Sequence, residues 1–193
     1  PALHLNIEDY PALKKYFLDN FDIRQLEQSG KKYPELGFDA RKKTGNQWFE
    51  TQDQIAYYPE FEKEKVVYSE IVRQPQFYFD IKNFYVEATS FLMTGKNVKY
   101  ICGLLNSNPV TFFFKQWYAG GGLGEEGYRY KKAFLENLPL PPITPSNQPI
   151  VSQIEALVDK ILAAKKENPQ ADTKNLENEI DQLVYKLYNL TPE

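Results

Sequence analysis

The segment "KNVKYICGLLNSNPVTFFFKQWY", residues 96–118, holds two apolar stretches that are interrupted by "NSNP". Asn108 is suited to cap a helix and Pro109 fits a first helical turn, so the interruption predicts the end of one helix and the start of another. Leu, Ile, Val and Phe, the side chains most often found inside proteins, dominate both stretches. We therefore expect two helices that are mostly buried.

The chain before these helices changes to a period of two, which is typical of strands. Five short segments rich in aromatic and β-branched residues are separated by turn signals: "WFET" (48–51), "QIAYY" (54–58), "KVVYSEI" (65–71), "QFYFD" (76–80) and "FYVEAT" (84–89). They predict an antiparallel sheet. Nearer the N-terminus we expect an amphipathic helix over 9–28 and a long polar loop over 31–47.

After the two helices, the proline-rich stretch "LPLPPITPSNQP" predicts a boundary. Beyond it, apolar residues recur at helical spacing in two segments, which indicates an antiparallel helical hairpin. The predicted fold class is α+β, with an antiparallel β-rich body and its buried helices over 1–142 and the hairpin over 143–193. The apolar stripes are too long for two helices to bury against each other, so we expect the hairpin to pack on a partner domain.

The 193 residues carry a net charge of −3, and that charge is unevenly distributed. Residues 143–193 hold five Lys/Arg against eight Asp/Glu, which leaves 18 of each in residues 1–142. No run approaches the ~18 apolar residues of a membrane helix and no signal peptide is present, so we expect no membrane partner. The single Cys102 fits a reducing cytoplasm. Because the chain opens with "PALHL", we expect it to be part of a larger protein.

Gly122, Gly124 and Gly127 match the G-x-G-x-x-G spacing of a dinucleotide-binding turn. That motif needs a strand before the glycines and a helix after them, so that backbone amides meet the pyrophosphate. Here the order is reversed, and Glu125 and Glu126 would repel phosphate. We interpret the stretch as a loop, either a flexible connection or a segment that orders on DNA.

Patterns for catalysis are sparse. "SNPV" at 107–110 lacks the second proline and the aromatic residue of the N-P-P-[YFW] tetrad of amino-methyltransferases, and no glycine-rich segment suits S-adenosylmethionine. The nearest nuclease pattern is Asp80-x-Lys82 with Asp53 as a second carboxylate for a divalent metal. Strands produce this pattern by chance, and no third acidic residue is placed to help. We expect no catalytic residues and no metal site.

Six phrases stand in an order that is more specific than any one of them: "YPALKKYF", "RKKTGNQWFETQD", "FEKEKVVYSEI", "FLMTGKNVKYICGLLNSNPVTFFFK", "RYKKAFLENLPLPPI" and "IDQLVYKLYNLTPE". Together they resemble the TaqI-like C-terminal specificity domain of adenine-N6 DNA methyltransferases and fused type IIG restriction–modification enzymes. The resemblance implies a target recognition domain that reads a short base sequence in double-stranded DNA. It also implies a neighbouring N-terminal domain that methylates adenine with S-adenosylmethionine, with magnesium where the parent also cleaves, whereas this part would be non-catalytic and hold no cofactor.

Side-chain chemistry suggests which residues touch DNA, because Lys and Arg bind phosphates while Arg, Asn and Gln read base edges. The loop "ARKKTGNQW" contributes one group of candidates: Arg41, Lys42, Lys43, Asn46 and Gln47. A second group lies around the glycine stretch: Tyr118, Arg129, Tyr130, Lys131 and Lys132.

The sequence thus predicts a DNA recognition domain of a bacterial, cytoplasmic restriction–modification or methyltransferase enzyme. Two other readings stay open. One is a protein-interaction module of a defence complex that assembles through the hairpin. The other is a metal nuclease that uses Asp53, Asp80 and Lys82.

Overall fold

The computed structural model describes residues 5–53, 56–118 and 127–190, which form two compact units, Pro1–Pro59 and Glu60–Glu193. The predicted α+β class with antiparallel sheets and C-terminal helices is confirmed. The boundary predicted after residue 142 differs from this division, because the C-terminal helices pack onto the second unit. Within the described residues, none of the helices has the length and apolar character to cross a membrane.

The first unit contains short elements, and the helix predicted over 9–28 is broken in two. Phe21 has extended backbone angles, and the Asp22 carboxylate then accepts the N–H of Arg24 and caps a new helix. Trp48 packs edge-on against Phe17, with 6.1 Å between ring centroids. The elements, in chain order, are η1 (Ile7–Asp9), α1 (Pro11–Asn20), α2 (Ile23–Leu26), β1 (Lys32–Tyr33), η2 (Pro34–Leu36) and β2 (Phe38–Asp39). Strands β1 and β2 pair antiparallel within the segment that was predicted to be a loop.

The second unit is built on a three-stranded antiparallel sheet with the order β5-β3-β6. Its strands are β3 (Lys65–Ser69), β5 (Tyr78–Asp80) and β6 (Ser90–Thr94), and the short helix η3 (Tyr58–Glu62) precedes them. A separate antiparallel pair joins β4 (Ile71–Val72) to β7 (Tyr128–Arg129). The strands predicted over 48–51 and 84–89 are not formed, and residues 54–55 of another predicted strand lie outside the described residues.

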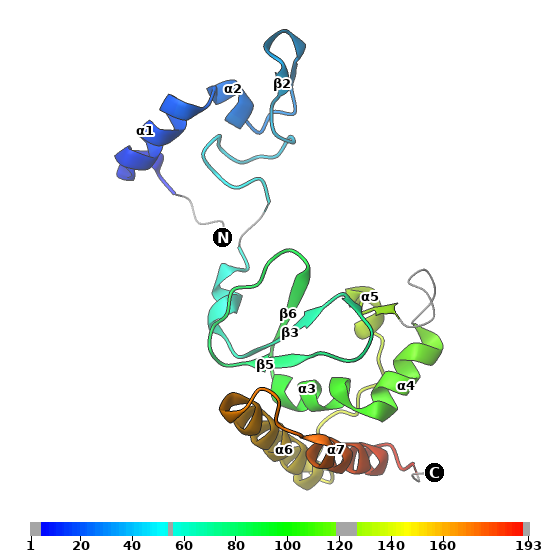
Figure 1. Ribbon diagram of the computed structural model, residues 1–193. Coiled ribbons are helices and arrows are strands. Elements are labelled where there is room, and N and C mark those ends of the chain that lie inside the picture. The colour runs from blue at the N-terminus through cyan, green and yellow to red at the C-terminus, as the bar shows by residue number, and fades with distance from the viewer. Residues whose placement is uncertain (1–4, 54–55, 119–126, 191–193) are drawn as a thin grey trace. The chain divides into compact units, whose positions relative to one another are not determined.

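Helices lie on one side of this sheet in two layers (Figure 1): α3 (Val98–Asn106), α4 (Asn108–Trp117), α6 (Gln148–Glu167) and α7 (Lys174–Leu187). The short helix α5 (Lys132–Leu135) follows β7. Helix α3 contacts β3 and β5, while α6 and α7 lie on its other side. The prediction of two helices followed by a helical hairpin is confirmed, and α3 is mostly buried as expected. The expectation that the second helix is mostly buried is wrong, because α4 turns Phe112 and Trp117 to solvent, 66% and 72% exposed.

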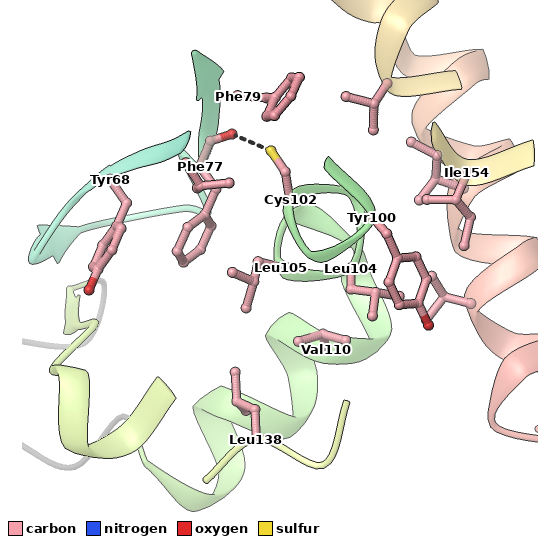
Figure 2. Close-up of a cluster of buried hydrophobic side chains, with 14 of the residues drawn as sticks. Tyr68, Phe77, Phe79, Tyr100, Cys102, Leu104, Leu105, Val110, Leu138 and Ile154 are labelled. Carbon is pink, nitrogen blue, oxygen red and sulfur yellow. Dashed lines mark hydrogen bonds between the residues drawn. The ribbon is translucent and has the colours of Figure 1, made fainter. Parts of the chain in front are cut away.

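The hairpin is held to the body by close packing between α3 and α6. Figure 2 shows Ile154 beside the cluster of buried side chains that α3 contributes. A Cβ on Gly103 would lie only 2.6 Å from Cγ2 of Ile154, so only glycine allows this approach. Leu157 and Ile180 of the hairpin stripes are also buried within the unit. The stripes are thus partly buried within the second unit itself, while Ile150, Ile161, Leu176 and Leu187 are only partly buried, and packing of the hairpin on a partner domain stays a prediction.

A second link joins α7 to the start of α4. The carboxylate of Asp181 accepts the backbone N–H of Asn108 at 2.8 Å and its side-chain Nδ2–H at 2.7 Å. Burial raises the pKa of Asp181, and the charge of Glu177 adds to this, although the bonds from Asn108 oppose the shift. Asp181 thus satisfies a free amide at the first turn of α4 from a segment far away in sequence.

Candidate nucleic-acid interface

Arg41 holds the first candidate loop together from inside. Its Nε and Nη2 donate to the carbonyl of Leu26 at 2.8 and 2.6 Å, Nη1 donates to the carbonyl of Glu50 at 3.0 Å, and Nη2 also donates to the carbonyl of Trp48 at 2.6 Å. Four of the five N–H groups of a guanidinium are thereby used. Arg41 could bind a phosphate or a guanine only if it broke hydrogen bonds that hold the loop in shape.

Gln28 forms the second internal support of the same loop, and sequence reasoning missed it. Its side chain is only 6% exposed, and Nε2 lies 3.0 Å from the carbonyl oxygen of Gln47 and 2.9 Å from that of Glu50. The hydroxyl of Thr44 donates to its Oε1. A lone glutamine in a helical-looking segment gives no signal of this role, because its partners lie about twenty residues further along the chain.

The remaining candidates of the loop differ in accessibility. Lys42 and Lys43 are exposed. The side chain of Gln47 is also exposed, while its backbone N–H donates to the Glu50 carboxylate at 2.6 Å. Asn46 is half-buried and its Nδ2 donates to the carbonyl of Thr51 at 2.9 Å. The fixed loop therefore presents two lysines and one free amide side chain to solvent.

In the second candidate group, the two tyrosines are structural. Tyr130 is 2% exposed and its ring packs against Phe77 and Phe114, each with 4.6 Å between centroids. Burial raises the pKa of Tyr130. Tyr118 is half-buried, stacks on Phe134 and donates its hydroxyl hydrogen to the carbonyl of Asn137 at 3.3 Å. Tyr130 in this conformation has no surface to offer a base.

The three cations of that group do face solvent. Arg129 is exposed and its Nη1 lies 3.9 Å from Glu70, which is a long ion pair. Lys131 lies over the ring of Phe134, and Lys132 pairs with Glu136 one helical turn away at 3.5 Å. Exposed pairs of this kind hold their partners weakly, so phosphate can compete for these cations. Residues 119–126 of the predicted glycine loop lie outside the described residues.

Residues 13–140 match the model of the TaqI-like C-terminal specificity domain. The chain belongs to this family. Membership indicates a domain that recognises a DNA sequence in a restriction–modification enzyme and that is not catalytic by itself. No curated protein matches the chain.

The matched residues of this specificity domain span parts of both compact units and stop before α6. Both loops that carry the candidate cations lie within the match, whereas the hairpin lies outside it. The resemblance predicted from the sequence is confirmed, over a shorter stretch than the phrases suggested.

The specificity domain uses Asp80, which we considered for a nuclease site, as a structural anchor. Its Oδ2 lies 2.6 Å from Nζ of Lys65, and both side chains are fully buried. Its two oxygens also accept the backbone N–H groups of Lys82 and Phe84 at 2.7 and 2.9 Å. The described residues contain no cluster of three or more His, Cys, Asp or Glu side chains that could hold a metal. Asp53 belongs to the other unit.

A cleft of about 640 Å³ opens in the second unit, bounded by residues 74–79 and helices α3, α4, α6 and α7. Its polar lining includes Gln76, Asn106, Asn108, Lys115, Lys165 and Glu177. Several are already occupied: Nδ2 of Asn106 donates to the carbonyl of Phe77, and Nζ of Lys165 donates to that of Ala171. The first of these bonds ties α3 to the segment before β5, and the second closes the turn between α6 and α7.

Proposed function

We propose that this domain is the target recognition part of a bacterial restriction–modification enzyme whose N-terminal domain methylates adenine at N6. The family match over residues 13–140 is the observation that carries the proposal. In this division of labour, the domain described here binds double-stranded DNA and selects the site, and the chemistry takes place in the neighbouring domain.

The exposed cations support DNA as the ligand. Lys42 and Lys43 project from a loop that Arg41 and Gln28 hold from within. In the second unit, Arg129, Lys131 and Lys132 are exposed around β7 and α5. Phosphate contacts by such side chains supply most of the sequence-independent affinity for DNA. Gln47, with its exposed amide, is the candidate of the first loop for reading a base edge.

The cofactors belong to the parent enzyme in this proposal. S-adenosylmethionine would bind the N-terminal methyltransferase domain, and magnesium would be needed where the parent also cleaves DNA, as type IIG enzymes do. Such an enzyme acts on DNA in the cytoplasm of a bacterium.

The test is fluorescence anisotropy of this chain with a duplex of randomised sequence at low and moderate salt. The double variants Lys42→Ala/Lys43→Ala and Lys131→Ala/Lys132→Ala each remove two exposed positive charges without touching Arg41. Lys160→Ala/Lys166→Ala removes two exposed charges from α6 and is the matched control. Each variant changes the net charge by the same amount.

Binding that weakens steeply with salt supports the proposal, because neutralised phosphates release counterions. The slope of log K against log salt should fall by about two in the first two variants and stay unchanged in the control. Equal slopes in all three variants would contradict these contacts. If the wild type binds no duplex at low salt but captures a methyltransferase domain added in trans, the protein-interaction reading replaces this one.

A further inference from the structure

The loop that follows β5 displays an unusual mixture of side chains to solvent. Ile81 is 60% exposed and Phe84 is 49% exposed, and between them stand the exposed Lys82 and Asn83. Two large apolar side chains, a cation and an amide thus share four consecutive positions. The sequence marked only Lys82, as part of the Asp80-x-Lys82 pattern, and placed Phe84 in a predicted strand.

Hydrogen bonds to the buried side chain of Asp80 fix the backbone of this loop. The carboxylate of Asp80 accepts the N–H groups of Lys82 and Phe84, and the same carboxylate is paired with buried Lys65. Nζ of Lys65 also donates to the carbonyl of Phe61 at 2.7 Å. Asn83 has a φ of 58°, the left-handed conformation that asparagine tolerates better than most residues. The exposed side chains therefore project from an anchored turn, so ordering them on a ligand costs little conformational entropy.

The exposed side chains of this loop suit a ligand that is anionic and that also has polar and apolar groups. Nζ of Lys82 lies 5.9 Å from the ring centroid of Phe84, and among the described residues Lys82 is in no ion pair. Even with the exposed Tyr78 and Tyr85 at its ends, this segment offers only a few large side chains, whereas a stable protein interface typically buries about 800 Å² on each partner, from roughly 20–30 residues. A groove of duplex DNA, in contrast, offers phosphates, base edges and thymine methyl groups within the reach of one short loop.

We propose that the loop Ile81–Phe84 enters a groove of the DNA target and contributes to sequence recognition. This inference rests on the proposed function and adds a third contact segment to it. Lys82 binds a phosphate, Asn83 reads a base edge with its amide, and Ile81 and Phe84 contact thymine methyl groups or a base step. Asp80 and Lys65 are positioning residues, since they act through the backbone of the loop.

The experiment compares three variants of this chain with exposed side chains: Lys82→Ala, Asn83→Gly and Phe84→Ala. Glycine is chosen at 83 because it removes the amide and still accepts the positive φ. Lys166→Ala on α6, which lies on the far side of α3 from the sheet, is the control for lost charge. The probes are a duplex pool with a randomised core, from which the wild type selects its preferred sequence, and duplexes with single base-pair changes in that sequence.

We expect Lys82→Ala to lower the salt slope by about one, while Lys166→Ala leaves it unchanged. Asn83→Gly should reduce discrimination at one base pair by about 5- to 150-fold and leave discrimination at the other positions intact. Phe84→Ala should weaken binding to the selected sequence more than binding to the random pool. Unchanged thermal unfolding midpoints would show that all four variants are folded.

One outcome overturns this inference and leaves the proposed function standing. In that outcome the wild type selects a sequence, and the loop variants match it in salt slope, affinity and selected sequence. A wild type that binds no duplex overturns both. A uniform loss of affinity in Asn83→Gly, with discrimination unchanged at every base pair, also overturns the base-reading role.

Discussion

Lys65 and Asp80 face each other on paired strands, with 2.6 Å between Nζ and Oδ2 and neither side chain exposed. Each strand contributes one member of the pair, so the bond fixes the register of β3 and β5 as well as the loop that follows. A buried ion pair gains little net stability over apolar side chains of similar size, but removing one partner leaves a charge without compensation.

Replacing Lys65 by methionine should therefore lower the free energy of unfolding by about 3–5 kcal/mol. The double change Lys65→Met/Asp80→Asn should recover much of this loss, because no buried charge remains. Urea denaturation of the three proteins measures both values. A single variant as stable as the wild type would show that Asp80 is not charged and buried in solution.

Acid should loosen the loop Ile81–Phe84 first. Burial raises the pKa of Asp80, but the bond from Lys65 and the amides of Lys82 and Phe84 outweigh it and hold the pKa below the ordinary value of 3.8. The stability that this carboxylate contributes is present above pH 3.8 and is lost as the pH falls through the lower folded-state pKa. Hydrogen exchange at the amides of Lys82 and Phe84 should accelerate over this range, and in Asp80→Asn the acceleration should be absent.

Gly103→Ala should destabilise the second unit, since the new methyl group would lie 2.6 Å from Cγ2 of Ile154. Overpacking of this kind costs about 1–3 kcal/mol. Ile154→Ala removes the opposing atom, so in a double-mutant cycle the two changes should together cost less than their sum. Additive costs would mean that α6 shifts away from α3 without difficulty.

Asp181→Ala should cost about 1–3 kcal/mol, because the amide groups of Asn108 lose their acceptor. Asp181→Asn should cost less, since its oxygen accepts the backbone N–H and the side-chain amide of Asn108 can turn to receive the new donor. The raised pKa of Asp181 means that its contribution declines as the pH rises from the ordinary value of 3.8 through the folded-state pKa. Denaturation across this range should show the decline in the wild type and not in Asp181→Asn.

Arg41→Ala should unfold the first candidate loop instead of acting only on DNA affinity. It leaves the carbonyl groups of Leu26, Trp48 and Glu50 without these donors, at a cost of at least about 1–3 kcal/mol. Faster hydrogen exchange at the backbone amides of positions 41 and 44, which donate to the carbonyls of Glu27 and Gln28, would report the loss, with Lys42→Ala as the control. Protection equal to the wild type would show that the guanidinium bonds are dispensable.

The sequence predicted correctly those helices whose start and stop signals lie within a few neighbouring residues. Residues 98–106 and 108–117 form the two expected helices, since "NSNP" contains both the stop and the start signal, but only the first of them is mostly buried. The helix over 9–28 was wrong in its length, because the extended backbone at Phe21 and the cap by Asp22 override the apolar spacing. The strand over 84–89 was wrong because Asp80 captures the amides of Lys82 and Phe84.

The site was harder to predict, because accessibility depends on partners that are distant in sequence. In the sequence, Arg41, Lys42 and Lys43 look equally suited to bind phosphate. In the structure, Arg41 is bonded to carbonyl groups of its own unit, whereas the two lysines are exposed. Alternation of Tyr128 and Tyr130 with Arg129 fits a half-buried strand, and the structure buries both tyrosines. Lys65 looks like an ordinary strand lysine until Asp80 is seen opposite it.

The contact of Ile154 with Gly103 decides how this domain could be transplanted between enzymes. A chimera joined at the proline-rich stretch would take α3 from one parent and α6 from another, and Ile154, which is fully buried here, would meet whatever side chain the other parent has in place of glycine. A graft that carries residues 60–190 as one piece keeps this layer intact. Exchange of recognition specificity is therefore best attempted with the hairpin included, although the hairpin lies outside the family match.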